Sequence, residues 1–299
     1  MTALRLATRR SPLAMAQSRQ VAEAITAATG RPVELVEVVS QGDRTDAPLT
    51  QIGGVGVFVV AVRQAVLDGT ADLAVHSLKD LPTAPAEGLT LAAVPPREDV
   101  RDALVGATLA DLAPAARVGT GSPRRAAQLR VLRPDLEIVD IRGNVDSRIA
   151  RTDSGDVDAV VVALAGLRRL GRTDRVAQIM AVHQMVPAPG QAALAIETRT
   201  DDVDTGAAVA VLDDPVTRAA VTAERSLLRA LEAGCTAPVG ALATVVDDQI
   251  ILDAAVWGGG AEVRGSFTGP RDDAESLGAQ AAAALIADGA DQLVGGTIR

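Results

Sequence analysis

The chain has 299 residues and a net charge of −9 at pH 7, and it contains one Cys, two His, one Trp, two Phe and no Tyr. The acidic charge and the few aromatic rings argue against a nucleic-acid-binding protein, because phosphates require basic groups and unpaired bases stack on rings. One cysteine cannot form an internal disulfide bond, and two histidines do not favour a metal site, so we predict no metal. With no apolar run that could span a membrane and no secretory signal, we expect a cytoplasmic protein without a membrane partner.

The first region, which ends near Pro95, alternates strands with helices. Its clearest helix, at residues 11–30, has Ser11 as its N-cap, Pro12 at its first position and Gly30 at its end. In chain order we predict a strand at 3–8, this helix, a strand at 32–40, a helix at 56–69 and a strand at 71–77.

The second region, from about Val100 to Val186, repeats this alternation. We predict a strand at 116–120, a helix at 122–132, a strand at 136–141, a helix at 144–155 and a strand at 156–164. Strands that alternate with helices and are apolar almost throughout are typical of a parallel sheet covered on both faces. The two regions therefore predict two similar α/β halves with a cleft between them.

The third region begins near Asp214 and has a different pattern. A helix at 214–234 carries an aspartate cap, a proline at its first position and a terminal glycine. Short turns join the strands predicted at 239–247, 249–257 and 262–269, which indicates an antiparallel sheet. A last helix at 273–289 completes a smaller α+β module.

Basic residues gather where the predicted strands end. Arg9 and Arg10 lie at the carboxyl end of the first strand, and Lys79 and Asp80 follow the strand at 71–77. GTGSPRR and IRGNVDSR each follow a strand and open a helix. In open α/β sheets, ligands bind beyond the carboxyl ends of the strands. All basic residues are arginine except Lys79, and guanidinium groups are suited to paired hydrogen bonds with carboxylates or phosphates. The pattern predicts a substrate with several acidic groups.

Arginines in the first turn of a helix oppose the helix dipole, at a cost of about 0.3–1 kcal/mol each. Arg124 and Arg125 take such positions behind Ser122, the predicted cap, and the arrangement recurs with Arg142 and Arg148. A docked anion would remove this mismatch and would bind the N–H groups of the helix start. The alternative is that these side chains, like the arginine pair of GLRRLG, extend into solvent.

The segment AVHSLKD and the lone cysteine are each open to more than one interpretation. Asp80 is suited to stabilising a cationic intermediate or moving a proton, or else it pairs with Lys79 or caps a turn. Lys79 is also a candidate for a Schiff base, whereas His76 fits a packed strand residue better than a ligand. Cys235 lies in a loop, where a thiol is presented for chemistry, although a lone cysteine is commonly a small buried hydrophobic residue.

Eight segments, in this order, resemble the porphobilinogen deaminase family, also called hydroxymethylbilane synthases, and together they cover nearly the whole chain. They are LRLATRRSPLAMAQ, AVHSLKDLPT, PREDVRDA, GTGSPRRAAQLR, RPDLEIVDIRGNVDSR, DAVVVALAGLRRLG, VPAPGQAALAIE and AERSLLRALEAGCTAPVG. The resemblance implies a transferase of tetrapyrrole (heme) biosynthesis. Such an enzyme joins four porphobilinogen molecules head to tail on a covalently bound dipyrromethane cofactor with release of ammonia, and then hydrolyses the product to hydroxymethylbilane.

The resemblance also implies the fold and the domains. We expect an α/β chain with two doubly wound domains of the periplasmic-binding-protein type II class, followed by a C-terminal α+β domain with a three-stranded antiparallel sheet. Domain 1 is expected at residues 1–96 and 190–211, domain 2 at 97–189, and domain 3, which carries the cofactor cysteine, at 212–299. Members are usually monomeric, so we expect a monomer whose partner is the small molecule porphobilinogen.

Motif positions carry the family's functional residues onto this chain. The resemblance assigns Cys235 as the thioether attachment of dipyrromethane and Asp80 as the catalytic carboxylate, which would hold pyrrole N–H groups and stabilise the positive charge left by ammonia. Phe58 is expected over the cleft. The residues expected to bind the carboxylates of cofactor and substrate are Arg9, Ser11, Gln17, Lys79, Ser122, Arg124, Arg125, Arg142, Arg148 and Arg169.

The chain departs from the family pattern at several positions. Val55 and Val60 stand where lysines are common, so the glycine-rich loop adds no charge there. Gly121 replaces a common serine and Pro123 a common leucine, which removes a hydroxyl group and stiffens the start of the helix. Ala192 stands where glycine is usual in the family, and Gly190 stands close to it at a position where glycine is not usual. None of these changes removes a residue assigned to the chemistry, so we expect an active enzyme.

Other functions fit parts of the same pattern. A non-catalytic cytoplasmic binder of a small polycarboxylate would use the arginine-rich edge but would not need Cys235. A Schiff-base enzyme would form its adduct on Lys79, and a pathway relative with a degenerate site would carry no adduct. The mass of a dipyrrole on Cys235 distinguishes these functions from the deaminase.

Overall fold

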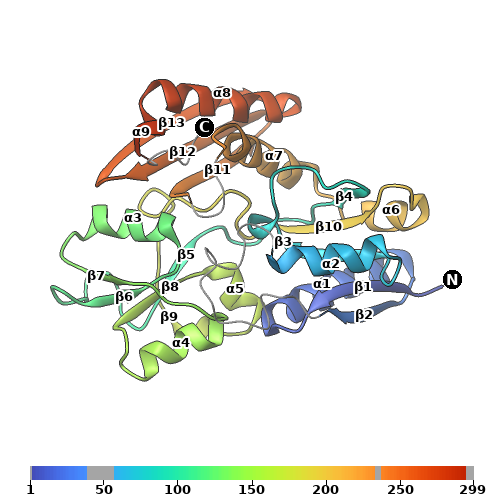
Figure 1. Cartoon of the computed structure of the whole chain (residues 1–299), viewed down its shortest axis with the longest axis horizontal. Helices are drawn as coiled ribbons and strands as arrows, with labels where there is room; N and C mark the ends of the chain where they lie inside the picture. The colour runs from blue at the N-terminus through green and yellow to red at the C-terminus, as the bar shows by residue number, and fades with distance from the viewer. Residues whose placement is uncertain (1, 39–56, 233–236, 294–299) are drawn as a thin grey trace. The chain divides into compact units, whose positions relative to one another are not determined.

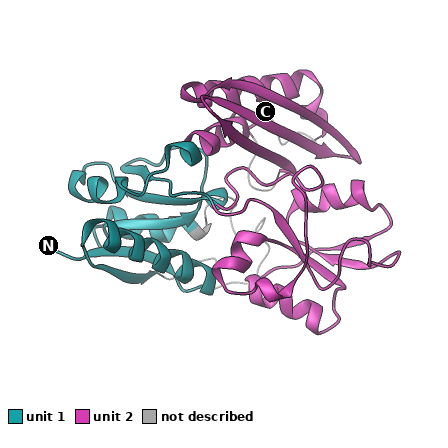
Figure 2. Ribbon diagram, turned by 180° about the vertical axis from the view of Figure 1, so that it is seen from behind, with its two compact units in different colours: residues 1–97, 193–218 teal, residues 98–192, 219–299 magenta. Residues whose placement is uncertain are grey.

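The computed structural model describes residues 2–38, 57–232 and 237–293. These residues form two five-stranded sheets and one three-stranded sheet (Figure 1). The chain divides into two compact units, unit 1 with residues 1–97 and 193–218 and unit 2 with residues 98–192 and 219–299 (Figure 2). None of the helices in the described ranges is long and apolar enough to cross a membrane.

The sheet of unit 1 has the strand order β2-β1-β3-β10-β4. Its strands are β1 (Leu4–Arg9), β2 (Val33–Val38), β3 (Leu73–Ser77), β4 (Leu89–Ala93) and β10 (Leu194–Arg199). The same unit contains α1 (Pro12–Thr29), α2 (Val57–Leu67), α6 (Val203–Ala210) and the 3-10 turn η2 (Leu78–Asp80). Apolar side chains of α1 and α6 pack on one face of the sheet and those of α2 on the other, so the sheet is covered on both faces.

Helix α1 begins and ends where its sequence predicts. The Ser11 hydroxyl accepts a hydrogen bond from the Ala14 N–H at 3.3 Å, and Pro12 takes the first helical position. Gly30 ends the helix with a φ of +72° and donates its N–H to the Thr26 carbonyl. Glycine adopts this left-handed conformation without the steric cost that a Cβ brings.

The α/β sheet of unit 2 has the strand order β7-β6-β8-β5-β9. Its strands are β5 (Asp102–Val105), β6 (Arg117–Gly119), β7 (Glu137–Val139), β8 (Ala159–Ala163) and β9 (Val176–Ile179). The helical elements beside it are α3 (Pro123–Leu132), α4 (Val145–Asp153), α5 (Leu164–Arg169) and the 3-10 turn η3 (Thr173–Arg175). Leu129 of α3 belongs to the core on one face, while Ile149 of α4 and Leu167 of α5 belong to the core on the other.

Both five-stranded sheets are mixed, whereas the alternation of elements predicted parallel sheets. β1, β2 and β3 run parallel, as do β6, β7 and β8. β10 runs antiparallel to β3 and β4, and β5 runs antiparallel to β8 and β9. The alternation pattern describes elements that are neighbours along the chain, so it could not show a strand such as β10, which follows the α/β part of unit 2 in sequence.

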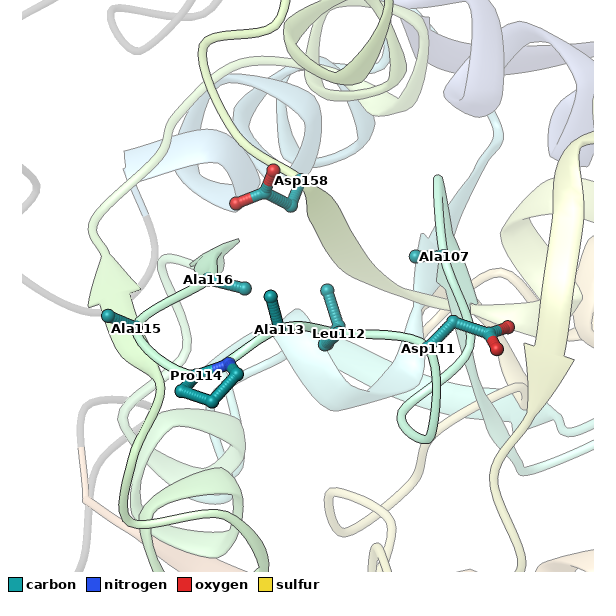
Figure 3. Close-up of a pocket in the computed structure, with 8 residues that line it drawn as sticks. All are labelled: Ala107, Asp111, Leu112, Ala113, Pro114, Ala115, Ala116 and Asp158. Atoms are coloured by element: carbon teal, nitrogen blue, oxygen red, sulfur yellow. The ribbon is translucent and has the colours of Figure 1, made fainter.

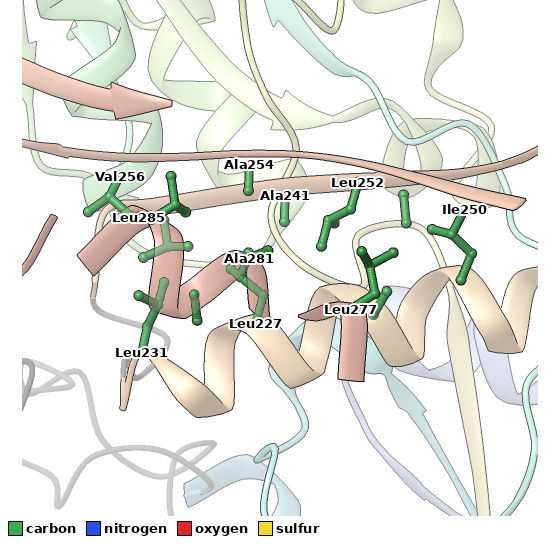
Figure 4. Close-up of a cluster of buried hydrophobic side chains, with 14 of the residues drawn as sticks. Leu227, Leu231, Ala241, Ile250, Leu252, Ala254, Val256, Leu277, Ala281 and Leu285 are labelled. Atoms are coloured by element: carbon green, nitrogen blue, oxygen red, sulfur yellow. The ribbon is translucent and has the colours of Figure 1, made fainter. Parts of the chain in front are cut away.

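The C-terminal sheet is antiparallel, as predicted, with the strand order β11-β12-β13. Its elements are β11 (Val239–Val246), β12 (Gln249–Gly258), β13 (Ala261–Pro270), α7 (Pro215–Ala230), η4 (Arg271–Asp273), α8 (Ala274–Ala287) and α9 (Ala290–Leu293). Leu227 of α7 and Leu277 and Leu285 of α8 pack against Ile250 and Leu252 of β12 (Figure 4). This apolar core joins the two long helices to one face of the sheet.

The predicted α/β class is confirmed by the two five-stranded sheets with their covering helices, and the predicted three-stranded antiparallel sheet is confirmed at the C-terminal end. The likeness to the periplasmic-binding-protein type II class stays a prediction. The predicted division into three domains stays a prediction, because unit 2 groups the second α/β sheet with the C-terminal sheet.

Gly278 of α8 permits a close approach to α7. A Cβ at this position would lie 2.3 Å from the Ala223 carbonyl oxygen and 2.7 Å from the Ser226 Cβ. Replacing glycine by alanine inside a helix ordinarily stabilises a protein by about 1 kcal/mol, but here the two helices would have to separate. We predict that Gly278→Ala lowers the free energy of unfolding by about 1–3 kcal/mol, measured by urea denaturation.

The matched control is Gly206→Ala in α6, where nothing lies within 4 Å of the added Cβ. This substitution is expected to raise the free energy of unfolding by about 0.5–1 kcal/mol. A Gly278→Ala protein as stable as the Gly206→Ala protein would contradict the close packing of α7 against α8.

Candidate active site

In unit 1, the segment that bears Asp80 and Lys79 continues directly from β3 as the turn η2. Asp80 is exposed and Lys79 half-buried, whereas Leu78 between them and the strand is fully buried. The Leu78 N–H donates to the Ala193 carbonyl at 3.0 Å, and the Leu81 N–H donates back to the Leu78 carbonyl at 3.1 Å. The apolar strand and these backbone bonds therefore hold a short turn whose carboxylate is presented to solvent.

Residues of β1 and α1 lie near the same end of the sheet. Arg9 is the last residue of β1, which runs parallel to β3, and Ser11 caps α1. Gln17 is buried in α1, and its Nε2 donates to the hydroxyl of Ser77, the last residue of β3, at 2.8 Å. The structure thus brings Gln17 to the strand that leads into η2, where it supports the strand end; direct binding of a ligand by Gln17 stays a prediction.

In unit 2, the predicted pair Arg124 and Arg125 occupies the first turn of α3. Pro123 is the first helical residue, and the Ser122 hydroxyl accepts the Arg125 N–H at 3.5 Å. The two arginine side chains do not extend into solvent, since their residues are only 3% and 5% exposed. Each guanidinium group donates to one oxygen of Asp102 at 2.7 Å.

Asp102 is the centre of this buried cluster, and sequence reasoning did not single it out. The residue is 0% exposed, and its Oδ1 also accepts a hydrogen bond from Gln191 Nε2 at 2.9 Å. Burial alone would raise the pKa of Asp102, but the charges and hydrogen bonds of Arg124 and Arg125 outweigh burial and hold its pKa well below the ordinary value. One carboxylate shared by two guanidinium groups leaves the cluster with a net positive charge.

The remaining guanidinium donors bind backbone carbonyls within unit 2. Arg124 Nη1 donates to the Val186 carbonyl, and Arg125 Nη1 donates to the Val161 carbonyl at 3.1 Å. Gln128 of α3 also binds the Val186 peptide, accepting from its N–H at 2.7 Å and donating to its carbonyl at 3.1 Å. These bonds hold the start of α3 against two other segments and fix the direction of both arginine side chains.

Arg142 lies in the turn between β7 and α4, and Arg148 is the fourth residue of α4. Arg142 is exposed, and the half-buried Arg148 donates from Nε to the Gly143 carbonyl at 2.9 Å. Asn144 caps α4 by accepting the Ser147 N–H at 2.9 Å. Gly143 has a φ of +103°, and a Cβ there would lie 2.2 Å from the Ser147 hydroxyl oxygen, so only glycine permits this turn.

Arg169 ends α5 and donates from Nη2 to the Ala192 carbonyl at 2.7 Å. Burial lowers the pKa of Arg169, opposed by the charge of Glu98, but the guanidinium group of an arginine stays charged at neutral pH. Arg169 therefore adds a third, separately held guanidinium group to those of Arg124 and Arg125 in unit 2.

Two of the departures from the family pattern have structural consequences. A Cβ on Gly121 would lie 2.6 Å from the Ile141 carbonyl oxygen, so glycine lets the segment before α3 approach the segment before α4. Ala192 is buried and has a φ of +72°, a left-handed conformation that costs a residue with a side chain of order 1 kcal/mol or more. Gly190 has the same φ of +72° without that cost.

A pocket of about 440 Å³ in unit 2 is a poor candidate for this site. Its lining consists of Ala107, Asp111, Leu112, Ala113, Pro114, Ala115, Ala116 and Asp158 (Figure 3). Both carboxylates already accept a hydrogen bond within unit 2, Asp111 from the Thr108 hydroxyl and Asp158 from the Arg117 N–H, each at 2.6 Å. The pocket contains none of the residues predicted to act in catalysis or to bind carboxylates.

Two family models together match nearly the whole chain. The model of the porphobilinogen deaminase dipyromethane cofactor binding domain matches residues 4–207, and the model of the porphobilinogen deaminase C-terminal domain matches residues 218–287. The chain belongs to the porphobilinogen deaminase family. This confirms the predicted family and enzyme class, and the description of the first domain confirms the predicted dipyrromethane cofactor.

Curated relatives in this family match the chain from end to end. Porphobilinogen deaminase 1 of Streptomyces avermitilis is 56% identical over 316 residues, which cover 98% of each chain. Porphobilinogen deaminase of Thermobifida fusca is 54% identical over 308 residues, which cover 98% of this chain and 96% of the relative.

The guanidinium groups of unit 2 fit an acidic pyrrole group such as dipyrromethane. The Nε atoms of Arg124, Arg125 and Arg169 are buried and lack a hydrogen-bond partner within the part of the chain that the structure describes. Guanidinium N–H groups are good donors for the acetate and propionate side chains of a pyrrole. A net positive cluster with unused donors is the chemistry that such an anion requires.

The predicted site residues fall into two groups, one in each unit, and their roles in binding and catalysis stay predictions. Unit 1 contains Arg9, Ser11, Gln17, Lys79 and Asp80, and unit 2 contains Ser122, Arg124, Arg125, Arg142, Arg148 and Arg169. Phe58 is the second residue of α2. Cys235 and Val55 lie outside the described residues, so their predicted roles stay predictions.

We predict that Asp102→Asn lowers the free energy of unfolding by about 3–5 kcal/mol in chemical denaturation. Asparagine keeps the volume of the side chain but leaves two buried guanidinium groups without a negative partner. The control is Asp135→Asn, which removes the partly exposed pair of Asp135 with Arg133 at 2.6 Å and should cost less than about 1 kcal/mol. Equal losses of unfolding free energy in the two variants would show that the contribution of Asp102 to stability does not come from buried charge pairing.

Proposed function

We propose that this chain is a working porphobilinogen deaminase, in which Asp80 is the catalytic carboxylate and Cys235 carries the dipyrromethane. The chain joins four porphobilinogen molecules with release of ammonia and then hydrolyses the product to hydroxymethylbilane, the activity of its family. The observation that supports the assignment of Asp80 is its place on η2, an exposed carboxylate on a turn held by the end of a buried strand. We also propose a cytoplasmic monomer.

The charge of Asp80 suits the first chemical event on the substrate. When porphobilinogen loses ammonia, the electrons of the C–N bond leave with nitrogen, and the methylene-pyrrole that remains carries a positive charge shared with its N–H. A carboxylate aimed at this position stabilises the developing charge without having to reorganise. The Asp80 carboxylate would accept a hydrogen bond from the pyrrole N–H and offset the positive charge. Lys79 beside it would bind a substrate carboxylate.

The next event forms a carbon–carbon bond. A ring carbon of the neighbouring pyrrole supplies the electron pair for the new bond. That carbon then loses its proton to the surrounding water, which restores the aromatic ring. Asp80 is suited to hold the N–H groups of both pyrroles, so that the reacting carbons meet in one orientation. Dipyrromethane, when bound, supplies the first of these nucleophilic pyrrole carbons.

The arginines would hold the acidic side chains of cofactor and product. Each porphobilinogen brings one acetate and one propionate, so every addition increases the negative charge that the protein has to bind. Arg124, Arg125 and Arg169 each retain a buried N–H donor that no described residue uses, and the exposed Arg142 adds a further cation before the start of α4. Together with Arg9, Ser11, Gln17, Lys79, Ser122 and Arg148 they form the proposed set of carboxylate binders.

We predict that Asp80→Asn reduces the turnover of porphobilinogen by at least about 100-fold, because the amide keeps the size of the side chain but not its charge. The mass of the protein should still include the dipyrromethane. The control is Asp68→Asn, an exposed carboxylate of unit 1 that accepts from Gln64 at 2.7 Å, which should keep wild-type turnover. Near-normal turnover by Asp80→Asn would overturn the assignment.

The second prediction concerns the covalent attachment. Intact-protein mass spectrometry of the wild type should find one dipyrromethane above the mass of the chain, and peptide mapping should place it on Cys235. Cys235→Ser should have the mass of the chain alone, since serine cannot form a thioether. An adduct that survives in this variant, or one found on Lys79, would contradict the proposed attachment.

A further inference from the structure

Unit 1 contains a buried ionic cluster that the proposed chemistry does not use. Glu197 of β10 is 4% exposed, and its two oxygens accept from Nε and Nη2 of Arg63 on α2 at 2.8 and 2.7 Å. His76 of β3 is 7% exposed, and its Nε2 lies 3.2 Å from Glu197 Oε2. The carboxylate thus joins three elements, α2, β3 and β10.

Glu197 is charged inside the protein. Burial alone would raise the pKa of Glu197, but the hydrogen bonds from Arg63 and the close approach of His76 lower it to about 2. Replacing a buried ion pair by apolar side chains is often neutral or even stabilising, so stability alone does not account for a buried ion pair. A cluster of this kind is better explained by the geometry that it imposes on its neighbours.

The geometry that it imposes concerns the end of β3. In the sheet His76 lies opposite Ala195 of β10 and Ser77 lies opposite Leu194. Ala193, the residue directly before β10, accepts a hydrogen bond at its carbonyl from the N–H of Leu78. Leu78 is the residue before Lys79 and Asp80. The strand that carries Glu197 is therefore the strand that holds the first residue of η2.

The two faces of β3 are fixed from opposite sides. His76 and Ser77 are consecutive in a strand, so their side chains point to opposite faces of the sheet. Ser77 is bound by Gln17 of α1 at 2.8 Å, and His76 faces Glu197 and the α2 arginine. The strand end is held on the α1 side by a neutral hydrogen bond and on the α2 side by a charged cluster.

We propose that Arg63, Glu197 and His76 are positioning residues for the catalytic carboxylate. By fixing the register and tilt of the end of β3, they hold η2 so that Asp80 meets the substrate in one orientation. This inference rests on the proposed function of Asp80. Displacement of a catalytic group by about 1 Å can reduce a rate by about 100-fold, so the cluster acts on the rate of the chemistry more than on substrate affinity.

The test uses the holoenzyme with Glu197→Gln. We expect kcat for porphobilinogen to fall by about tenfold or more, while KM changes by less than about twofold. The dipyrromethane mass on the protein should be unchanged. Amide hydrogen exchange at Leu78 and Leu81 should become faster, which reports the freed strand end independently of activity.

A matched control lies at the other end of the same strand. Asp72, directly before β3, binds Arg5 of β1 through Nη2 at 2.7 Å and Nε at 3.2 Å. Asp72→Asn also removes an ion pair from β3, but at the end remote in sequence from Asp80. It should leave kcat within about twofold of the wild type and the exchange of Leu78 unchanged.

A double variant keeps the test informative if Glu197→Gln does not fold. Arg63→Met with Glu197→Met removes both charges and keeps apolar volume, so it should fold as stably as the wild type and still lose about tenfold or more in kcat. A folded double variant with wild-type kcat and KM would overturn the proposal. Failure of the wild-type holoenzyme to consume porphobilinogen would instead overturn the proposed function.

Discussion

Each unit holds a buried carboxylate beside the segment that bears its predicted site residues. In unit 2, Asp102 binds Arg124 and Arg125 at the start of α3, and in unit 1, Glu197 binds Arg63 beside β3. An isolated charge is very costly in a protein interior, so each of these side chains keeps its place only while its partner is charged. The rigidity of both groups of site residues depends on this guanidinium–carboxylate pairing.

The pairing also sets the charge that remains for a ligand. Two guanidinium groups share one carboxylate at Asp102, which leaves an excess positive charge. It also leaves the Nε donors of Arg124 and Arg125 without a partner among the residues that the structure describes. The directions of these donors are already set by hydrogen bonds to backbone carbonyls, so the binding of an anion costs little side-chain conformational entropy. Such an arrangement suits a cofactor and product whose negative charge grows with each addition.

Backbone geometry supplies the second constraint on the site in unit 2. Gly143 and Gly121 allow close approaches that any side chain would block, and both precede helices whose first turns carry predicted arginines. Ala192 has a left-handed conformation that is unfavourable for a residue with a Cβ, yet its carbonyl accepts the bond from Arg169. The surrounding packing and this hydrogen bond offset the local strain.

The resemblance of eight segments to one family identified that family and pointed to Asp80 and Cys235. Near-neighbour patterns in the sequence determined the caps and ends of α1 and the antiparallel C-terminal strands. These features were predictable because caps, turns and periodicity act over a few residues. Only the tertiary structure decided that Arg124 and Arg125 turn inward to Asp102, that Gln17 supports Ser77, and that β10 and β5 run antiparallel to their neighbours. An arginine in the first turn of a helix has the same local sequence whether it extends into solvent or reaches a buried carboxylate, and the outcome depends on which distant strand packs beside that helix.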